Sequence, residues 1–171
     1  PLSAGDEWPQ FQGPRADGHS NARGLPLTWS ESENVSWKTA IPGHGHSSPV
    51  ISGKEIWLTT AIQTKLTEEE KKAILAKVPN SRGLEIAGRV SLRAVCVARD
   101  SGEITRNIEL FQVDKPEPIH ALNSYASPSP IIENGKLYCH FGTYGTCCVD
   151  TASAKIEWKN TEHHADHQNG P

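Results

Sequence analysis

Short runs in which apolar and polar residues alternate recur along most of the chain, and turn residues separate them. Alternation over about four to eight residues is typical of a half-buried β-strand, because successive side chains of a strand point to opposite faces. The turn residues at 52–54 and 133–135 each join two such runs and predict β-hairpins. The whole pattern predicts strands at 35–39, 50–51, 56–60, 90–98, 103–110, 131–132, 137–141, 146–150 and 155–159.

One segment departs from the strand pattern. Residues 67–70, Thr-Glu-Glu-Glu, have the spacing of a capping box, in which the threonine and the last glutamate satisfy each other's backbone amides. Three apolar residues at helical spacing follow before Pro79: Ile74, Leu75 and Val78. We expect a short helix near 68–78, within an insertion over 62–90. Its apolar face is expected to dock on the chain's own strands, with a partner protein as the alternative.

The chain contains an internal repeat. Residues 48–57 match 129–138, and 96–106 match 148–158, with the helix-bearing insertion in the first copy. Each copy supplies about four short antiparallel strands, and one such sheet cannot cover both of its own faces. Sheets stacked radially cover one another, as the blades of a β-propeller do. The sequence therefore predicts an all-β fold, with about two four-stranded antiparallel blades of a β-propeller and one short helical insertion.

The repeat and the turn residues together divide the chain into expected parts. Trp8 and Trp29 are expected to pin an extended N-terminal arm to a surface of the molecule. The parts are the arm at 1–34, a strand at 35–39 that closes the last blade, a first blade at 47–110 with its insertion at 62–90, a connection at 111–128, a second blade at 129–159, and an inter-blade loop at 160–171.

Composition narrows the class of protein. Lysine and arginine number 17 against 20 acidic residues, so the basic excess typical of a nucleic-acid partner is absent. The apolar runs are too short for a transmembrane helix. The chain has no methionine, even at position 1, which suggests a removed signal peptide and a periplasmic or extracellular location, with a trimmed fragment as the alternative. Gly170 and Pro171 are turn residues, so we expect the chain to be truncated there.

Three stretches and one motif carry a resemblance to a known family. Residues 148–158, CVDTASAKIEW, resemble the tryptophan-docking repeat A-x-D-x-x-T-G-x-x-x-W of quinoprotein-like propellers, with Cys148, Ser153 and Ala154 in place of its Ala, Thr and Gly. The first copy departs further, with Ala98 at the Asp position and Arg106 at the Trp position. The stretches 8–14, 123–130 and 141–146 are similar to secreted bacterial pyrroloquinoline-quinone-binding-like β-propeller repeat proteins.

The resemblance implies a ring of about seven or eight blades, of which the remaining ones lie elsewhere in the protein. It also implies a role in blade docking for Trp37, Asp150 and Trp158. Many proteins of this family bind no quinone, so function has to be inferred from a site rather than from the fold.

The leading hypothesis is a non-enzymatic binding or scaffold module of the cell envelope. The sequence has no phosphate-binding G-x-x-x-x-G-K-[ST] loop, no HExxH motif and no G-x-S-x-G nucleophile elbow. A protein or small-molecule ligand would contact the blade-top loops at 43–48, 120–128 and 160–171. The candidate contact residues in these loops are His46, His120, Asn123, Ser124, Tyr125 and His167.

Two alternatives remain open. The first is a fragment of a pyrroloquinoline-quinone (PQQ)-dependent dehydrogenase that uses calcium, since the adjacent Cys147 and Cys148 resemble the paired cysteines of quinoprotein alcohol dehydrogenases. Two neighbours on a strand would otherwise point to opposite faces and simply pack. The second alternative is a structural subunit whose ring is completed by a partner chain.

Two further kinds of site are candidates. A metal ion could be bound by His163, His164 and His167, or more weakly by His44 and His46, because imidazole nitrogens suit zinc or copper. A solvated inter-blade loop is the simpler interpretation of the first group. If residues 142–145 form the turn, Cys139 lies opposite Cys148, and a cross-strand disulfide between them is an open alternative to free thiols.

Overall fold

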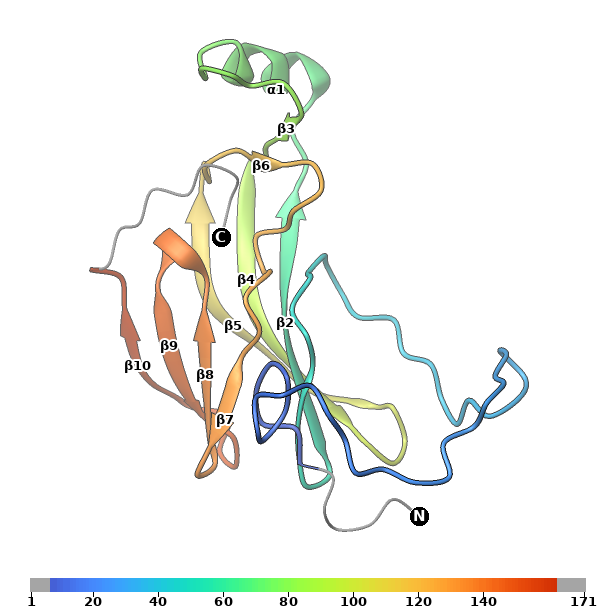
Figure 1. Cartoon of the computed structure of the whole chain (residues 1–171). Helices are drawn as coiled ribbons and strands as arrows, with labels where there is room; N and C mark the ends of the chain where they lie inside the picture. Colours follow the sequence, from blue (N-terminus) through green and yellow to red (C-terminus); the bar gives the residue numbers. More distant parts are fainter. Residues whose placement is uncertain (1–6, 163–171) are drawn as a thin grey trace.

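Two four-stranded antiparallel sheets make up most of the computed structural model, which describes residues 7–162 (Figure 1). In the first sheet the strand order is β1 (Val50–Ser52), β2 (Glu55–Thr64), β4 (Arg89–Ala98) and β5 (Ile104–Asp114). In the second sheet the order is β7 (Ile131–Glu133), β8 (Lys136–His140), β9 (Thr146–Asp150) and β10 (Ile156–Asn160). The expected all-β class is confirmed.

Smaller elements complete the structure. A two-stranded sheet pairs β3 (Leu84–Glu85) with β6 (Ile119–His120), and a short helix, α1 (Glu68–Leu75), precedes it. A single 3₁₀ turn, η1 (Gly142–Tyr144), joins β8 to β9.

The described residues include no helix with the length and apolar character to span a bilayer. Within 7–162 the sheets form no closed ring.

The two sheets repeat the same topology, as the internal repeat predicts. The hairpins expected around 52–54 and 133–135 join β1 to β2 and β7 to β8. Gly53 and Gly135 lie in these turns with φ values of +57° and +73°, a conformation that glycine adopts without steric cost. The repeated turn chemistry thus accounts for the first hairpin of each sheet.

The strands of the first sheet are longer than the alternation of residues predicts. Pairing between β2 and β4 continues as far as Thr64 and Arg89, and β5 continues to Asp114. The ends of these strands are polar, so the apolar pattern fades while the backbone hydrogen bonds continue. The segment inserted between β2 and β4 is therefore 65–88, shorter than the expected 62–90.

The strand expected at 35–39 does not form. A strand needs the backbone of a neighbouring strand, and no segment of the described chain hydrogen-bonds to 35–39 in this way. Side chains hold the segment instead: Trp37 Nε1 donates to the carbonyl of Arg99 (2.8 Å), and Thr39 Oγ1 donates to the carbonyl of Gly102 (2.5 Å). A Cβ atom at Gly102 would lie 2.6 Å from the Trp37 ring, so this contact requires glycine.

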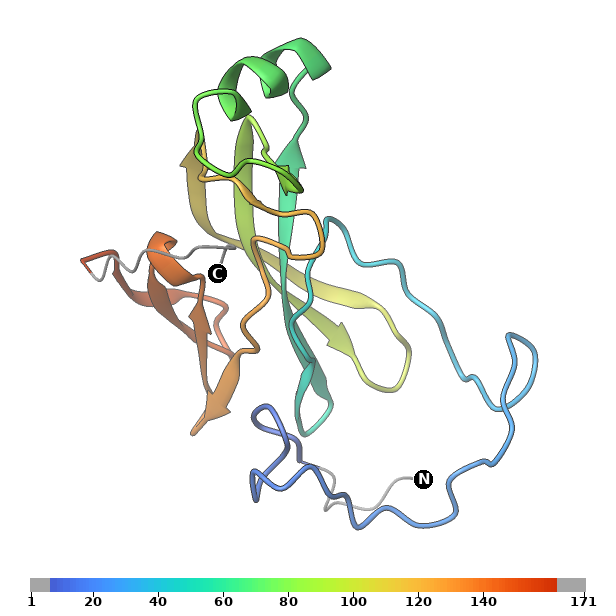
Figure 2. The ribbon, with the colours of Figure 1, turned by 45° about the horizontal axis from the view of Figure 1, so that its top comes forward.

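Only one of the two expected anchors of the N-terminal arm makes contact with the sheets. Trp8 exchanges two backbone hydrogen bonds of 2.9 Å with Ile51, which attaches the arm to β1. Trp29 is 70% exposed, so the expectation that it pins the arm is wrong. The turn around it hydrogen-bonds within itself, from Ser30 to Glu33, and Figure 2 shows this part of the arm extending away from the sheets.

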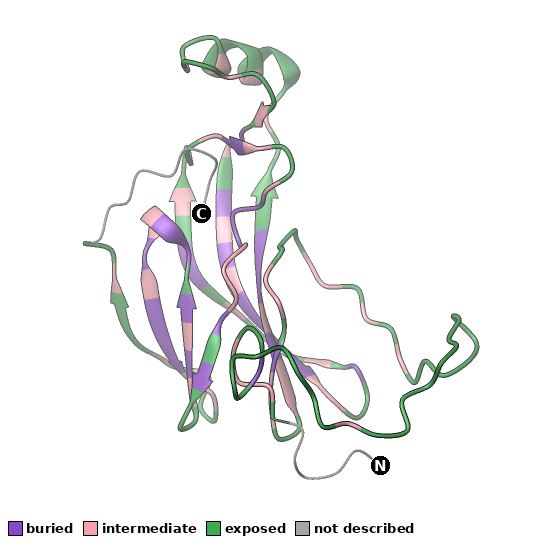
Figure 3. Ribbon diagram, viewed as in Figure 1, coloured by how far each residue is buried: buried purple, intermediate pink, exposed green. Residues whose placement is uncertain are grey.

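The main hydrophobic core lies between the two sheets. Trp57, Val50 and Leu92 contribute to it from the first sheet, and Leu137 and Val149 from the second, all with no exposed surface. The buried positions alternate with exposed ones along several strands (Figure 3). The first strands of the two sheets, β1 and β7, are neighbours, so the sheets approach each other most closely where each begins.

The capping box of the predicted helix is confirmed. The Thr67 hydroxyl accepts from the Glu70 amide (3.2 Å), and the Glu70 carboxylate accepts from the Thr67 amide (2.8 Å). The helix ends at Leu75, and the last expected turn, to Val78, has tighter i→i−3 hydrogen bonds. No residue of α1 is buried, and Ile74 is 37% exposed, so its apolar face is only partly covered by the chain itself.

Replacing Thr67 with alanine is expected to destabilise α1 by about 1 kcal/mol, because the Glu70 amide loses its partner. Hydrogen exchange of the helix amides should become roughly fivefold faster, since α1 has few tertiary contacts to compensate. Thr28→Ala is the control, because its exposed side chain makes no capping contact. Unchanged exchange in Thr67→Ala would show that tertiary contacts, and not the cap, hold the helix.

Candidate functional site

Two of the three predicted contact loops meet beside the first strands of the sheets. The backbone amides of His46 and Ser47 both donate to the carbonyl of Ala126 (3.0 and 3.2 Å), and the Ser48 amide donates to Ser129 Oγ (2.9 Å). The loops at 43–48 and 120–128 are therefore joined by direct hydrogen bonds. Most of the third loop, including His167, lies outside the described residues.

A cavity of about 370 Å³ lies where the inserted segment faces the 119–125 loop. Three of the predicted contact residues line it: His120, Asn123 and Tyr125. Its apolar walls come from Ile86, Ala87 and Ile119, and its polar groups include His44, Gln63 and Lys65. The sequence alone missed Gln63, Lys65 and the apolar wall, because only the fold brings the insertion against this loop.

The charges at this cavity are largely compensated. Lys71 Nζ lies 3.1 Å from Glu68 and 3.4 Å from Glu85, and these two carboxylates raise the pKa of Lys71. Burial raises the pKa of Tyr125 to about 12, and its hydroxyl donates to the carbonyl of Glu117 (2.9 Å). A tyrosine held protonated in this way supports the loop and is a poor general base at neutral pH.

Ser124 and Tyr125 lie inside the fold, contrary to their expected role as exposed contacts. They are 0% and 1% exposed. Ser124 Oγ lies 3.0 Å from Ser127 Oγ, and Asn123 Oδ1 accepts from the Ser124 amide (2.8 Å) and the Ser127 hydroxyl (2.5 Å). The polar side chains of this loop bind one another because a buried loop must satisfy its own polar groups. Asn123 both fixes the loop and lines the cavity.

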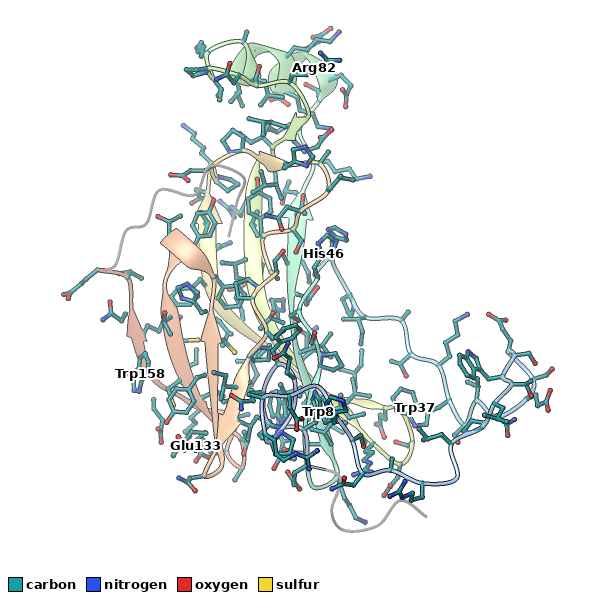
Figure 4. All side chains as sticks on the ribbon, in the orientation of Figure 1. Trp8, Trp37, His46, Arg82, Glu133 and Trp158 are labelled. Atoms are coloured by element: carbon teal, nitrogen blue, oxygen red, sulfur yellow. The ribbon has the colours of Figure 1, made fainter. Side chains whose placement is uncertain are left out.

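A second cavity, of about 400 Å³, lies where the N-terminal arm meets the first strands. His46 lines it together with Phe11 and three serines, Ser48, Ser127 and Ser129. The His44 ring lies 4.8 Å from the His46 ring, edge to face. His44 lines the first cavity, and His46 lines the second. Figure 4 shows His46 beside the first sheet. A Cβ atom at Gly45 would lie 2.7 Å from the Thr59 carbonyl, so this close approach requires glycine.

The register that a Cys139–Cys148 disulfide would require does not form. Cys139 lies opposite Cys147, and Cys148 lies opposite Tyr138. The Phe141 amide donates to the Gly145 carbonyl across the hairpin, so the turn that this pair closes holds three residues, 142–144, instead of the expected four. A shift of one residue moves a side chain to the other face of a sheet. All four cysteines of the chain are free thiols.

The adjacent Cys147 and Cys148 do not fit a quinone site. Their side chains point to opposite faces of β9, since neighbours on a strand alternate. They are 0% and 1% exposed, and neither lines either of the two cavities. No chemical step through a quinone is supported by this pair.

The predicted metal ligands fall partly outside the described residues. His163, His164 and His167 are among the residues that the structure does not describe. Over 7–162 there is no group of three or more His, Cys, Asp or Glu side chains arranged to hold a metal ion. His44 and His46 therefore form a pair without a third such ligand in this part of the chain.

The three residues expected to dock blades occupy distinct environments, and Figure 4 labels two of them, Trp37 and Trp158. Trp37 packs on Gly102 in the turn between β4 and β5. Asp150 accepts hydrogen bonds from the amide and hydroxyl of Ser153 (2.8 and 2.7 Å). Trp158 is 44% exposed, with its ring 6.3 Å from that of Tyr138 on the outer face of the second sheet.

Arg106, at the position equivalent to Trp158 in the repeat, is turned onto its own sheet. Its guanidinium lies 5.8 Å from the centre of the Trp57 ring and 2.5 Å from the Glu55 carboxylate. The ion pair and the aromatic ring together hold Arg106, and the carboxylate raises its pKa. The first repeat thus has an arginine that contacts its own sheet at the position where the second repeat has the half-exposed Trp158.

The Asp150 carboxylate is expected to titrate well below its ordinary range. Hydrogen bonds from Ser153, with the nearby Lys136 ammonium (2.9 Å), lower its pKa. A lowered native pKa stabilises the fold above the unfolded-state value of about 4, and this contribution is lost as pH falls through the native pKa. Carboxyl NMR shifts measured against pH should show the low midpoint.

Ser153→Ala is the matched variant for this titration, since it removes the hydroxyl donor and keeps the backbone amide. The Asp150 midpoint should move up, toward its ordinary value, because one of its hydrogen bonds is lost. An Asp150 midpoint near 4 in the unaltered protein would contradict the prediction.

Comparison with known proteins identifies no family. No family model matches the chain. A search of curated proteins also finds no significant match.

Proposed function

We propose that the chain is part of a secreted or periplasmic β-propeller that binds a protein or small-molecule ligand through its loop face, without catalysis. The observation that carries the proposal is the repeated sheet: two consecutive four-stranded sheets have the same strand order. Their first strands, β1 and β7, are neighbours, and the loops that precede these strands are joined by hydrogen bonds. Successive blades of a propeller repeat one strand order in this way. The resemblance of 148–158 to quinoprotein-like repeats supports the same architecture.

The outer face of the second sheet supports further blades. Trp158, Ile131 and Tyr138 lie there, and Trp158 and Ile131 are 44% and 46% exposed. Apolar residues that gather on one sheet face are typical of a surface that another element covers. On the first sheet, Trp37 shows how a tryptophan from a neighbouring segment docks on the turn of a blade, through Gly102. Trp158 would dock on the next blade in the same manner.

The position of both cavities supports binding at the loop face. Each is lined by residues of the two joined loops, 43–48 and 120–128. Ligand sites are commonly concave, with apolar walls and a few polar groups that fix orientation. The first cavity has this composition, with Ile86 and Ile119 among its walls and Gln63, His120 and Asn123 among its polar groups.

A panel of oligosaccharides and peptides in solution tests the binding site directly. A ligand of the proposed site should bind at least tenfold more weakly to Gln63→Ala, because that side chain lines the first cavity. Gln112→Ala is the matched control, since Gln112 is exposed on β5 and lines neither cavity. Binding that weakens equally in both variants, or no binding by any member of the panel, would count against the site.

A test for quinone binding distinguishes the proposed binding module from a quinone-dependent enzyme. The complete protein is mixed with pyrroloquinoline quinone and Ca²⁺, and binding is followed by the absorbance of the quinone. We expect no saturable binding and no dye-coupled oxidation of alcohols or sugars. Saturable binding with oxidation would establish a quinone-dependent dehydrogenase.

Native mass measured beside intact mass tests whether one chain completes the ring. A monomeric complete protein with a closed ring supports the proposal. A stable complex with a different chain would instead establish a structural subunit whose ring a partner completes.

A further inference from the structure

Two thiols face each other across the hairpin of β8 and β9. Cys139 and Cys147 are direct cross-strand partners, and neither has any exposed surface. Residues directly opposite in an antiparallel pair share one face of the sheet. Both side chains therefore belong to the core between the two sheets, together with Leu137 and Val149.

The hydrogen-bond pattern of the hairpin fixes the spacing of these two residues. The Phe141 amide donates to the carbonyl of Gly145 (2.9 Å), and Cys139 and Cys147 lie two residues further along each strand. Antiparallel pairs alternate between two kinds, so Cys139 and Cys147 form a hydrogen-bonded pair with a Cα separation of about 5.5 Å. Disulfides join residues whose Cα atoms are about 4.4–6.8 Å apart. The backbone spacing of this pair thus falls within the range that a disulfide requires.

The two thiols are chemically unequal. A hydrogen bond from the Cys139 thiol, with the positive charge of Lys159, lowers the pKa of Cys147. The same hydrogen bond and burial raise the pKa of Cys139. Lys159 is the residue opposite Cys147 on β10, so the three residues form a row across the sheet. A thiolate is the nucleophile in disulfide exchange, and Cys147 is the one of the pair placed to supply it.

We propose that Cys139 and Cys147 form a cross-strand disulfide by exchange with a small-molecule disulfide of the glutathione type. The Cys147 thiolate attacks one sulfur of the oxidant, whose S–S bond breaks and releases one thiolate. Cys139 then gives up its proton to that thiolate and attacks the Cys147 sulfur, which displaces the second thiolate. The two cysteines lose two electrons and two protons, and the oxidant is reduced to two thiols.

The remaining cysteines are placed where they cannot compete. Cys148 lies on the opposite face of β9, with its sulfur 3.7 Å from Glu157, and burial raises its pKa. Cys96 lies in the first sheet, where its sulfur accepts a hydrogen bond from Arg106 (3.8 Å). A bond from Cys139 to Cys148 would require the shift of register that the hairpin excludes.

Burial determines when the reaction takes place. Because Cys139 and Cys147 have no exposed surface, an oxidant reaches them before the two sheets pack together, when β8, β9 and β10 are already paired. The test therefore refolds the full chain from the reduced, denatured state in a buffer of oxidised and reduced glutathione. Free thiols are then alkylated, and the unreduced protein is digested with a protease that cleaves after aromatic residues. Phe141 and Tyr144 lie between the two cysteines, so a disulfide holds two peptides together.

Mass spectrometry with fragment sequencing should find Cys139 linked to Cys147 in most molecules, and reduction should separate the peptides. Cys148→Ser should leave this linkage unchanged, and Cys147→Ser should abolish it. The mapping of the unaltered chain decides the question even if a variant folds poorly. Alkylated Cys139, a Cys139–Cys148 linkage or a Cys147–Cys148 linkage as the main product would overturn the proposal.

Discussion

Replacing Trp57 with alanine is expected to lower the free energy of unfolding by about 3–5 kcal/mol. The Trp57 side chain is the largest in the core and has no exposed surface. Its Nε1 donates to Glu55 (3.0 Å), and the Arg106 guanidinium lies over its ring. The substitution removes apolar contacts, leaves a cavity and releases the cation from its aromatic partner. Denaturant unfolding of the full chain, followed by circular dichroism, measures the loss.

Trp29→Ala is the matched control for Trp57→Ala. The two changes remove the same atoms, but Trp29 is 70% exposed on the extended arm. Its replacement should change the free energy of unfolding by no more than about 0.5 kcal/mol. Equal losses from the two variants would show that Trp29 is covered in solution and that the arm packs on the molecule.

Replacing Gly145 with alanine is expected to cost about 2–4 kcal/mol of unfolding free energy. Gly145 follows η1 with φ +121° and ψ 179°, a conformation that is nearly restricted to glycine. A Cβ atom there would lie 2.6 Å from the Asn160 carbonyl of β10 and 3.2 Å from the Phe111 ring. Backbone strain and overlap with a neighbouring strand therefore add. The same denaturant unfolding measures the effect.

Gly135→Ala separates the two contributions. Gly135 also has a positive φ, +73°, but a Cβ atom there would lie 3.9 Å from its nearest neighbour, Thr151 Oγ1. This variant has only the conformational cost of a left-handed residue, about 1–2 kcal/mol. If Gly145→Ala costs no more than Gly135→Ala, the predicted overlap with β10 is absent in solution.

Local sequence patterns predicted the individual elements well where the reason for the element is local. The capping box at 67–70 forms as expected, because its hydrogen bonds join groups within one turn of chain. The hairpins at 52–54 and 133–135 form for the same reason. The strand at 35–39 does not form, because a strand depends on a neighbour that local sequence cannot supply.

The candidate site could be predicted only in part. His46, His120 and Asn123 were expected in contact loops, and each lines a cavity. Ser124 and Tyr125 have equally polar groups but are almost completely buried, although Tyr125 also lines the first cavity. Sequence shows that a side chain can bind a ligand, but its exposure depends on what packs around it.

The sequence by itself determined the class of this protein, its repeated strand order and its hairpin turns. These follow from the alternation of side chains along strands and from turn residues that need a positive φ. Only the tertiary structure decided the register of β8 and β9, which places Cys139 beside Cys147 instead of Cys148. It also decided that the inserted segment closes a cavity against the 119–125 loop. The physical reason is that a turn one residue shorter shifts the pairing of the two strands by one position, and this changes which side chains share a face. Contacts between distant segments depend on the packing of whole sheets.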